Sequence, residues 1–112
     1  MANDDTEALF LALIQLDPKS RFDRLKDTVP DIIDLLNRFS KKDMEQVCRS
    51  SDGTLFGFFL RTKTHPNIIR AELEKLVATT NNDTFLIVEV GKKFGGRGFS
   101  RAWTWLQHRQ AA

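Results

Sequence analysis

The chain has 112 residues, of which 41% are hydrophobic and 29% are charged. It is long enough for one domain with its own core, and too apolar for an intrinsically disordered protein. Its single cysteine, Cys48, excludes an internal disulfide and a cysteine-based zinc site, and fits a reducing compartment. The formal net charge is only +2, but the stretch from Val90 to the C-terminus carries cations and no acid.

The N-terminal region begins with a polar arm at 1–6 and continues with an apolar run at 8–16. The run is too short to span a bilayer, and acids rather than cations precede it, so we expect a cytoplasmic protein without a signal peptide or membrane segment. Its alanines and leucines favour a helix. A short run that is apolar on both faces and stops at Asp17-Pro18 also fits a buried central strand. Composition leaves both possibilities open.

The next segment, 19–39, has apolar residues spaced three and four apart, which predicts an amphipathic helix. Pro30 lies inside this pattern. Proline lacks an amide donor and disfavours helical geometry at the residue before it, so we expect a kink or a break into two short helices.

The rest of the chain predicts five elements, which are a strand at 44–50, a strand at 54–62, a helix from Thr64, a strand at 84–90 and a helix at 99–109. Asp52-Gly53 marks a hairpin turn between the first two strands. The strands at 54–62 and 84–90 carry large apolar residues on both faces. The two earlier helices can cover one face of this sheet. The second face needs cover from the last helix or from another chain, so we expect a homodimer that buries part of it.

A glycine-rich loop follows the last strand. Gly91 and Gly96 have the spacing of a phosphate-binding loop, but the lysine and hydroxyl residue that this loop requires are missing, so we expect no nucleotide cofactor. The candidate anion or nucleic-acid contacts in this region are Lys92, Lys93, Arg97 and Arg101. The alternative is a flexible, solvated loop.

Four short stretches occur in order along the chain, "LFLALIQLD", "FFLRTK", "IIRAEL" and "NNDTFLIVEV". Because these stretches occur in this order, residues 8–91 resemble the SinR-like and VapD-like small bacterial proteins. Those proteins are distant relatives of the small CRISPR-associated endoribonuclease that also serves in spacer integration. If 8–16 is a strand, the predicted elements have the order βαββαβ, which is ferredoxin-like. We therefore expect one α+β domain with an antiparallel sheet of order 4-1-3-2, two helices on one face, and an added C-terminal helix at 99–109.

The resemblance assigns a possible role to Asp17. The CRISPR-associated relatives place a catalytic or metal-binding aspartate at the end of the first strand, where two protomers bring a pair of carboxylates together. Such a pair could hold Mg²⁺ and activate water. Here Leu16 replaces the aromatic residue that usually precedes this aspartate. We expect Asp17 instead to turn the chain or to cap the next helix.

The expected function is a small interaction or regulatory module of the defence or toxin–antitoxin kind. It would act as a homodimer that binds a protein or RNA partner without catalysis and without a cofactor. The alternative is an Mg²⁺-dependent endoribonuclease that uses Asp17 at the dimer seam.

Overall fold

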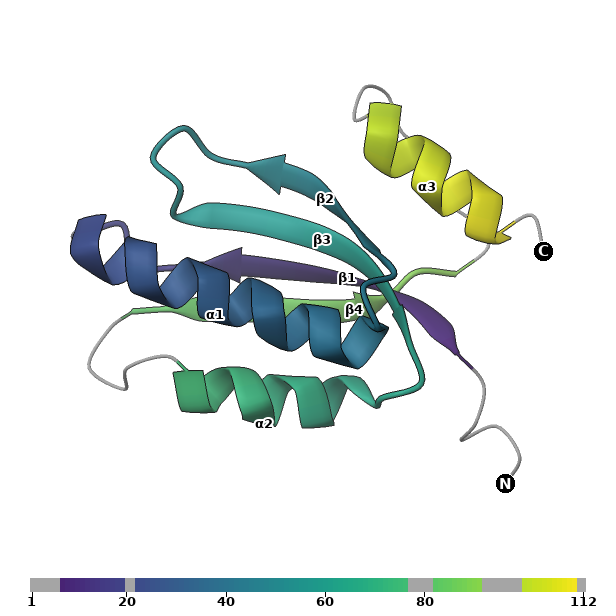
Figure 1. The fold of residues 1–112 in the computed structure, drawn as a ribbon, viewed down its shortest axis with the longest axis horizontal. Helices are drawn as coiled ribbons and strands as arrows, with labels where there is room; N and C mark the ends of the chain where they lie inside the picture. The colour runs from purple at the N-terminus through teal and green to yellow at the C-terminus, as the bar shows by residue number, and fades with distance from the viewer. Residues whose placement is uncertain (1–6, 20–21, 77–81, 92–99, 111–112) are drawn as a thin grey trace.

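The fold is a four-stranded antiparallel sheet with two helices on one face and a third helix beside one edge (Figure 1). The structure is a computed structural model that describes residues 7–19, 22–76, 82–91 and 100–110, so the predicted arm at 1–6 lies outside it. Its elements are β1 (Ala8–Gln15), α1 (Phe22–Ser40), β2 (Met44–Arg49), β3 (Leu55–Thr62), α2 (Pro66–Leu76), β4 (Thr84–Glu89) and α3 (Ser100–Gln110). This is the predicted ferredoxin-like order with an added C-terminal helix.

The apolar N-terminal run is a strand and not a helix. β1 lies between β3 and β4 in a sheet of order β2-β3-β1-β4, which reads 4-1-3-2 from the opposite edge. Ala12, at its centre, pairs with Phe58 on one side and Ile87 on the other. The short two-sided pattern therefore outweighs the helix propensity of alanine and leucine, because a central strand buries both of its faces.

The first helix runs from Phe22 to Ser40 without a break, so of the kink or break expected at Pro30, the break into two short helices is wrong. Pro30 is exposed, and the carbonyl that loses its amide partner can therefore bond to water. The inner side of the same helix is buried through Ile32, Leu35 and Leu36. Leu25 and Val29, which precede Pro30, also pack against the core, so apolar contacts on both sides of the proline favour one helix over two.

The core lies between the sheet and the pair α1 and α2. Alternate residues of the central strands point into it, as the period of two requires. The buried core residues are Phe10, Ala12, Ile14 and Leu16 from the first strand and its end, Ile32, Leu35 and Leu36 from α1, Phe56, Phe58 and Leu60 from β3, and Ile69 and Leu73 from α2. Each predicted strand matches the observed one to within a residue at either end.

The hairpin between β2 and β3 has two irregular features. A β-bulge between Gln46 and Cys48 shifts the register of β2. At the turn, Asp52 Oδ1 accepts hydrogen bonds from the Thr54 amide at 3.1 Å and from the Ser50 hydroxyl at 2.7 Å. Gly53 has a φ of 77°, a left-handed conformation that glycine adopts at little cost. The Asp52-Gly53 turn prediction is confirmed.

Gly57 of β3 is buried and closely surrounded by its neighbours. A Cβ atom added there would be 3.1 Å from Leu13 Cδ1 and 3.3 Å from Cys48 Sγ. We expect Gly57→Val to lower the free energy of unfolding by about 2 kcal/mol, because extra carbon atoms in a packed interior force side chains from their positions.

Urea unfolding followed by circular dichroism measures this change. Gly91→Val is the matched control, since no atom of the residues that the structure describes lies within 4 Å of a Cβ added at Gly91. In a Leu13→Ala background Gly57→Val should cost less than in the parent. An equal cost in both backgrounds would contradict the assigned contact.

Candidate functional site: the Asp17 corner and the outer sheet face

Asp17 follows β1 at the corner where the chain turns toward α1. Its Oδ1 atom accepts a hydrogen bond from the Lys19 amide at 2.9 Å, and its Oδ2 atom accepts one from the Asn82 amide at 3.4 Å. The first bond closes a local turn of the kind that aspartate forms with the amide two residues on. The second ties this turn to the residues that precede β4. The carboxylate therefore binds the backbone of its own chain.

Asp83 is the second carboxylate of this corner and the more deeply buried one. Its side chain is 1% exposed and forms a two-pronged ion pair with Arg24 of α1, in which Arg24 Nη1 donates to Oδ1 at 3.0 Å and Nη2 donates to Oδ2. Oδ1 also accepts the Asp17 amide at 2.8 Å. A buried carboxylate is stable only when it is paired and hydrogen-bonded in this way. Asp83 thus joins the end of β1, the first turn of α1 and the start of β4.

The hydrogen bonds of the corner change the acidity of Asp17. The Lys19 amide is the main cause that holds the pKa of Asp17 below its usual value, with smaller help from the Asn82 amide and from the charges of Lys19 and Arg24. Because the pKa is lower in the folded chain than in the unfolded one, ionised Asp17 stabilises the fold. The stabilisation by Asp17 is fully present at pH values above its unfolded-state pKa of 3.8. It is lost as the pH falls through the lower pKa that Asp17 has in the folded chain.

The corner has little capacity for a divalent cation. A hard cation such as Mg²⁺ takes oxygen ligands and needs a clear surplus of negative charge. Here two carboxylates lie close together, but the guanidinium of Arg24 already neutralises Asp83. Within residues 7–19, 22–76, 82–91 and 100–110, no three histidine, cysteine or acidic side chains gather in a way that could hold a metal ion. The arrangement suits a structural clamp better than metal-assisted hydrolysis.

The predicted basic contacts are only partly placed. Lys92, Lys93 and Arg97 lie outside the described residues. Arg101 is in the first turn of α3, where its side chain is 89% exposed and lies 3.5 Å from a carboxylate oxygen of Glu45 in β2. At this exposure the ion pair contributes little stability, so Arg101 is a solvated cation at the surface.

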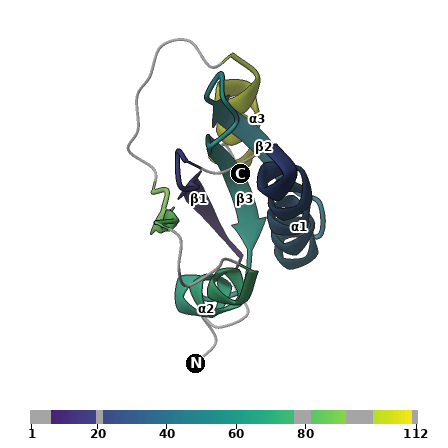
Figure 2. The same ribbon diagram turned by 90° about the vertical axis from the view of Figure 1, so that its left-hand side faces the viewer.

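Helix α3 lies at the β2 end of the sheet, far from α2 (Figure 2), and it packs there on the outer face, which is the face opposite α1 and α2. Trp105 stacks on Phe59 of β3 with ring centroids 6.3 Å apart. Arg109 lies over the Trp105 ring at 3.9 Å and donates from Nε to Asp43 at 3.1 Å. Ala102 and Leu106, on another side of α3, are buried. Helix α3 therefore packs on the β2 side of the outer face.

The β4 side of the outer face is apolar and partly open. Cross-strand pairing places Leu11 beside Val88 and Leu13 beside Leu86. We call these four residues the outer strip. Leu86 is 57% exposed and Val88 is 39% exposed, whereas Leu11 and Leu13 are half-buried. Neighbouring apolar side chains left exposed in this way are typical of a surface that binds another protein.

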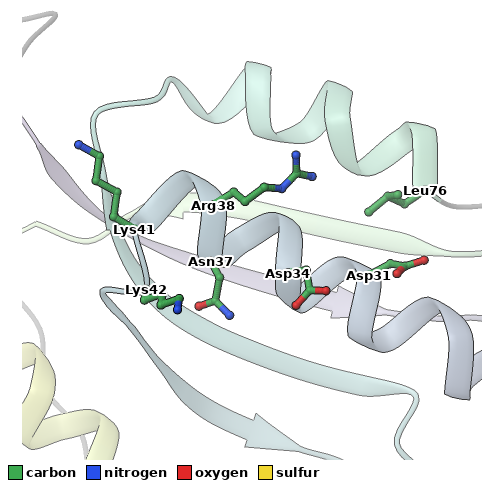
Figure 3. A pocket seen from close by; sticks show the side chains of 7 residues that line it. All are labelled: Asp31, Asp34, Asn37, Arg38, Lys41, Lys42 and Leu76. Atoms are coloured by element: carbon green, nitrogen blue, oxygen red, sulfur yellow. The ribbon is translucent and has the colours of Figure 1, made fainter.

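A separate hollow of about 720 Å³ runs along the exposed side of α1 to the end of α2. Its lining residues are Asp31, Asp34, Asn37, Arg38, Lys41, Lys42 and Leu76. Figure 3 shows the Lys41 side chain directed away from the other lining residues and the two acids at the opposite end of the hollow. Both signs of charge line the hollow, and its charged residues are all exposed, so we assign it to the solvated surface of the helix.

The comparisons with known proteins give no family. No protein-family model and no curated protein matches this chain. Among the described helices, none combines the length and apolar character that crossing a membrane requires.

Sequence analysis found Asp17 but missed the roles of Asp83 and Arg24. Asp83 was noted only within the "NNDTFLIVEV" stretch. The available signal for this ion pair was an acid directly before a very apolar strand, together with an arginine in the first turn of an earlier helix. Their separation of 59 residues hides the pair in the sequence.

Replacing Asp83 tests the clamp. We expect Asp83→Asn to lower the free energy of unfolding by about 3 kcal/mol, because it removes the buried carboxylate that binds both the Arg24 guanidinium and the Asp17 amide. Urea unfolding measures this effect. The matched control is Glu74→Gln, which removes one carboxylate of an exposed helix pair with Arg70 and should cost under about 0.5 kcal/mol. Equal small losses in both variants would contradict a structural role for Asp83.

Proposed function

We propose that this protein is a small, non-catalytic interaction module that self-associates and binds protein through the outer face of its sheet. The observation that carries the proposal is the outer strip, whose two β4 residues, Leu86 and Val88, remain exposed on a face that α3 covers only on its other side. A defence or toxin–antitoxin role and a cytoplasmic setting belong to the same proposal. They rest on the resemblance of residues 8–91 to SinR-like and VapD-like proteins and on the lone Cys48.

The chemistry of the strip supports a protein partner over RNA. Proteins that bind RNA need cations for the phosphates and flat side chains for the bases. The strip consists of leucine and valine alone, which suit a second apolar surface.

The geometry of Asp17 supports a module without catalysis. A nuclease would use this carboxylate to hold a cation or to activate water. Both oxygens of Asp17 instead accept backbone amides, those of Lys19 and Asn82.

Self-association should be measurable by sedimentation velocity over a range of protein concentrations. We expect a reversible dimer, and we expect Leu86→Lys combined with Val88→Lys to raise its dissociation constant at least about tenfold, equivalent to about 1.4 kcal/mol. The control is Ile68→Lys, which places the same charge on an apolar residue of α2 that is 54% exposed. A parent chain that stays monomeric, or a dimer weakened equally by the control, would contradict the proposal.

A ribonuclease assay tests the catalytic alternative. We expect no RNA cleavage by the parent or by Asp17→Asn, with or without Mg²⁺, because the Asp17 carboxylate is engaged by the chain itself. Asp52→Asn is the matched control, since Asp52 is also a loop carboxylate that accepts backbone amides. Mg²⁺-dependent cleavage that disappears in Asp17→Asn and persists in Asp52→Asn would overturn the proposal in favour of the endoribonuclease.

A further inference from the structure

β4 is an edge strand whose one charged residue is Glu89. It pairs with β1 on one side, and within the part of the chain that the structure describes no strand lies on its other side. Natural sheets protect such edges with lysine, proline or a bulge. The six residues of β4, "TFLIVE", contain no lysine and no proline, and the recorded register with β1 is regular.

The hydrogen-bonding pattern shows which backbone groups of β4 face this edge. The Val90 amide donates to the Leu9 carbonyl at 2.8 Å, so residues 84, 86 and 88 also direct their backbone groups toward β1. The backbone groups of Phe85, Ile87 and Glu89 therefore point to the open edge. An additional strand would bond to these three residues.

From these observations we infer that the occupant of the edge is the β4 strand of a second copy, paired antiparallel about a two-fold axis at Ile87. This inference rests on the proposed function, because it places the self-association proposed there at the β4 edge, which borders the outer strip, and gives its register. Ile87 would exchange two hydrogen bonds with Ile87 of the second copy, and Phe85 would pair with Glu89 of the second copy. The two sheets would form one continuous eight-stranded sheet.

The side-chain alternation limits the possible registers. Successive residues of a strand point to opposite faces of the sheet. Two β4 strands related by a two-fold axis therefore have their outer faces on the same side of the joined sheet only when the axis passes through a residue and not between two residues. An axis at Ile87 places Leu86 opposite Val88 of the second copy, which joins the two outer strips. An axis at Leu86 also keeps the faces matched, but it places Leu86 opposite itself.

Charge selects between these two registers. The axis at Leu86 would set Asp83 of each copy opposite Glu89 of the other, and like charges directly opposite each other destabilise a sheet. The axis at Ile87 sets Glu89 opposite the apolar Phe85 and leaves the centre of the interface uncharged. The register at Ile87 thus joins the apolar residues of the two copies and sets no like charges directly opposite each other, as a self-complementary isologous interface requires.

A charge-rescue experiment tests the register. Leu86→Glu and Val88→Lys are prepared separately, and sedimentation velocity measures each variant alone and the equimolar mixture. Each variant alone should dimerise at least about tenfold more weakly than the parent, because each sets two charges against apolar residues.

In the mixture, an axis at Ile87 places the introduced carboxylate opposite the introduced ammonium and Val88 opposite Leu86. We expect a heterodimer that recovers to within about threefold of the parent dissociation constant. An axis at Leu86 gives no such rescue, because the carboxylate would then face Leu86 and the ammonium would face Thr84.

The outcomes separate the two proposals. A mixture that forms the heterodimer supports pairing at Ile87. A parent that dimerises while the mixture stays dissociated overturns this pairing and leaves self-association intact. A parent that is monomeric at every concentration overturns both. Ile68→Lys mixed with Leu86→Glu serves as the control, since it supplies the same charge outside β4 and should give no rescue.

Discussion

The structure depends on the burial of β1 at the centre of the sheet. This strand is paired on both edges and covered on its inner face by the two helices, so it is the element to which both β3 and β4 are aligned. Its central Ala12 is fully buried between Phe58 and Ile87. The small side chain at this position leaves room for the large residues on either side, which bring most of the apolar area that drives folding.

The corner that ends β1 explains how two distant parts of the chain are held at one end of the sheet. Asp83 receives the Arg24 guanidinium and the Asp17 amide, while Asp17 receives the amides of Lys19 and Asn82. These four contacts connect the end of β1 to the start of β4 and to the first turn of α1. Both oxygens of the Asp17 carboxylate accept backbone amides, so this side chain contributes to the connection.

Much of the fold could be predicted because the strands at 54–62 and 84–90 have clear patterns, whereas the run at 8–16 became a strand only through the order of the elements. The two-sided apolar runs and the Asp52-Gly53 turn indicated an antiparallel sheet, and the strand limits follow from where polar residues begin. The course of α1 through Pro30 could not be predicted, because it depends on which side of the helix faces water. The site was harder still: Asp17 was visible as a carboxylate after a strand, but its partners Arg24 and Asp83 meet it only through the fold.

The two edges of the sheet differ, and this difference limits how large an assembly can grow. The β2 edge carries the bulge between Gln46 and Cys48 and lies beside α3, whose Trp105 and Arg109 anchor it. The β4 edge is regular and uncovered in the described part of the chain. If β4 pairs with a second copy as proposed, the sheet extends in one direction only and the pair is closed, because the bulge and α3 protect the β2 edge from a further strand.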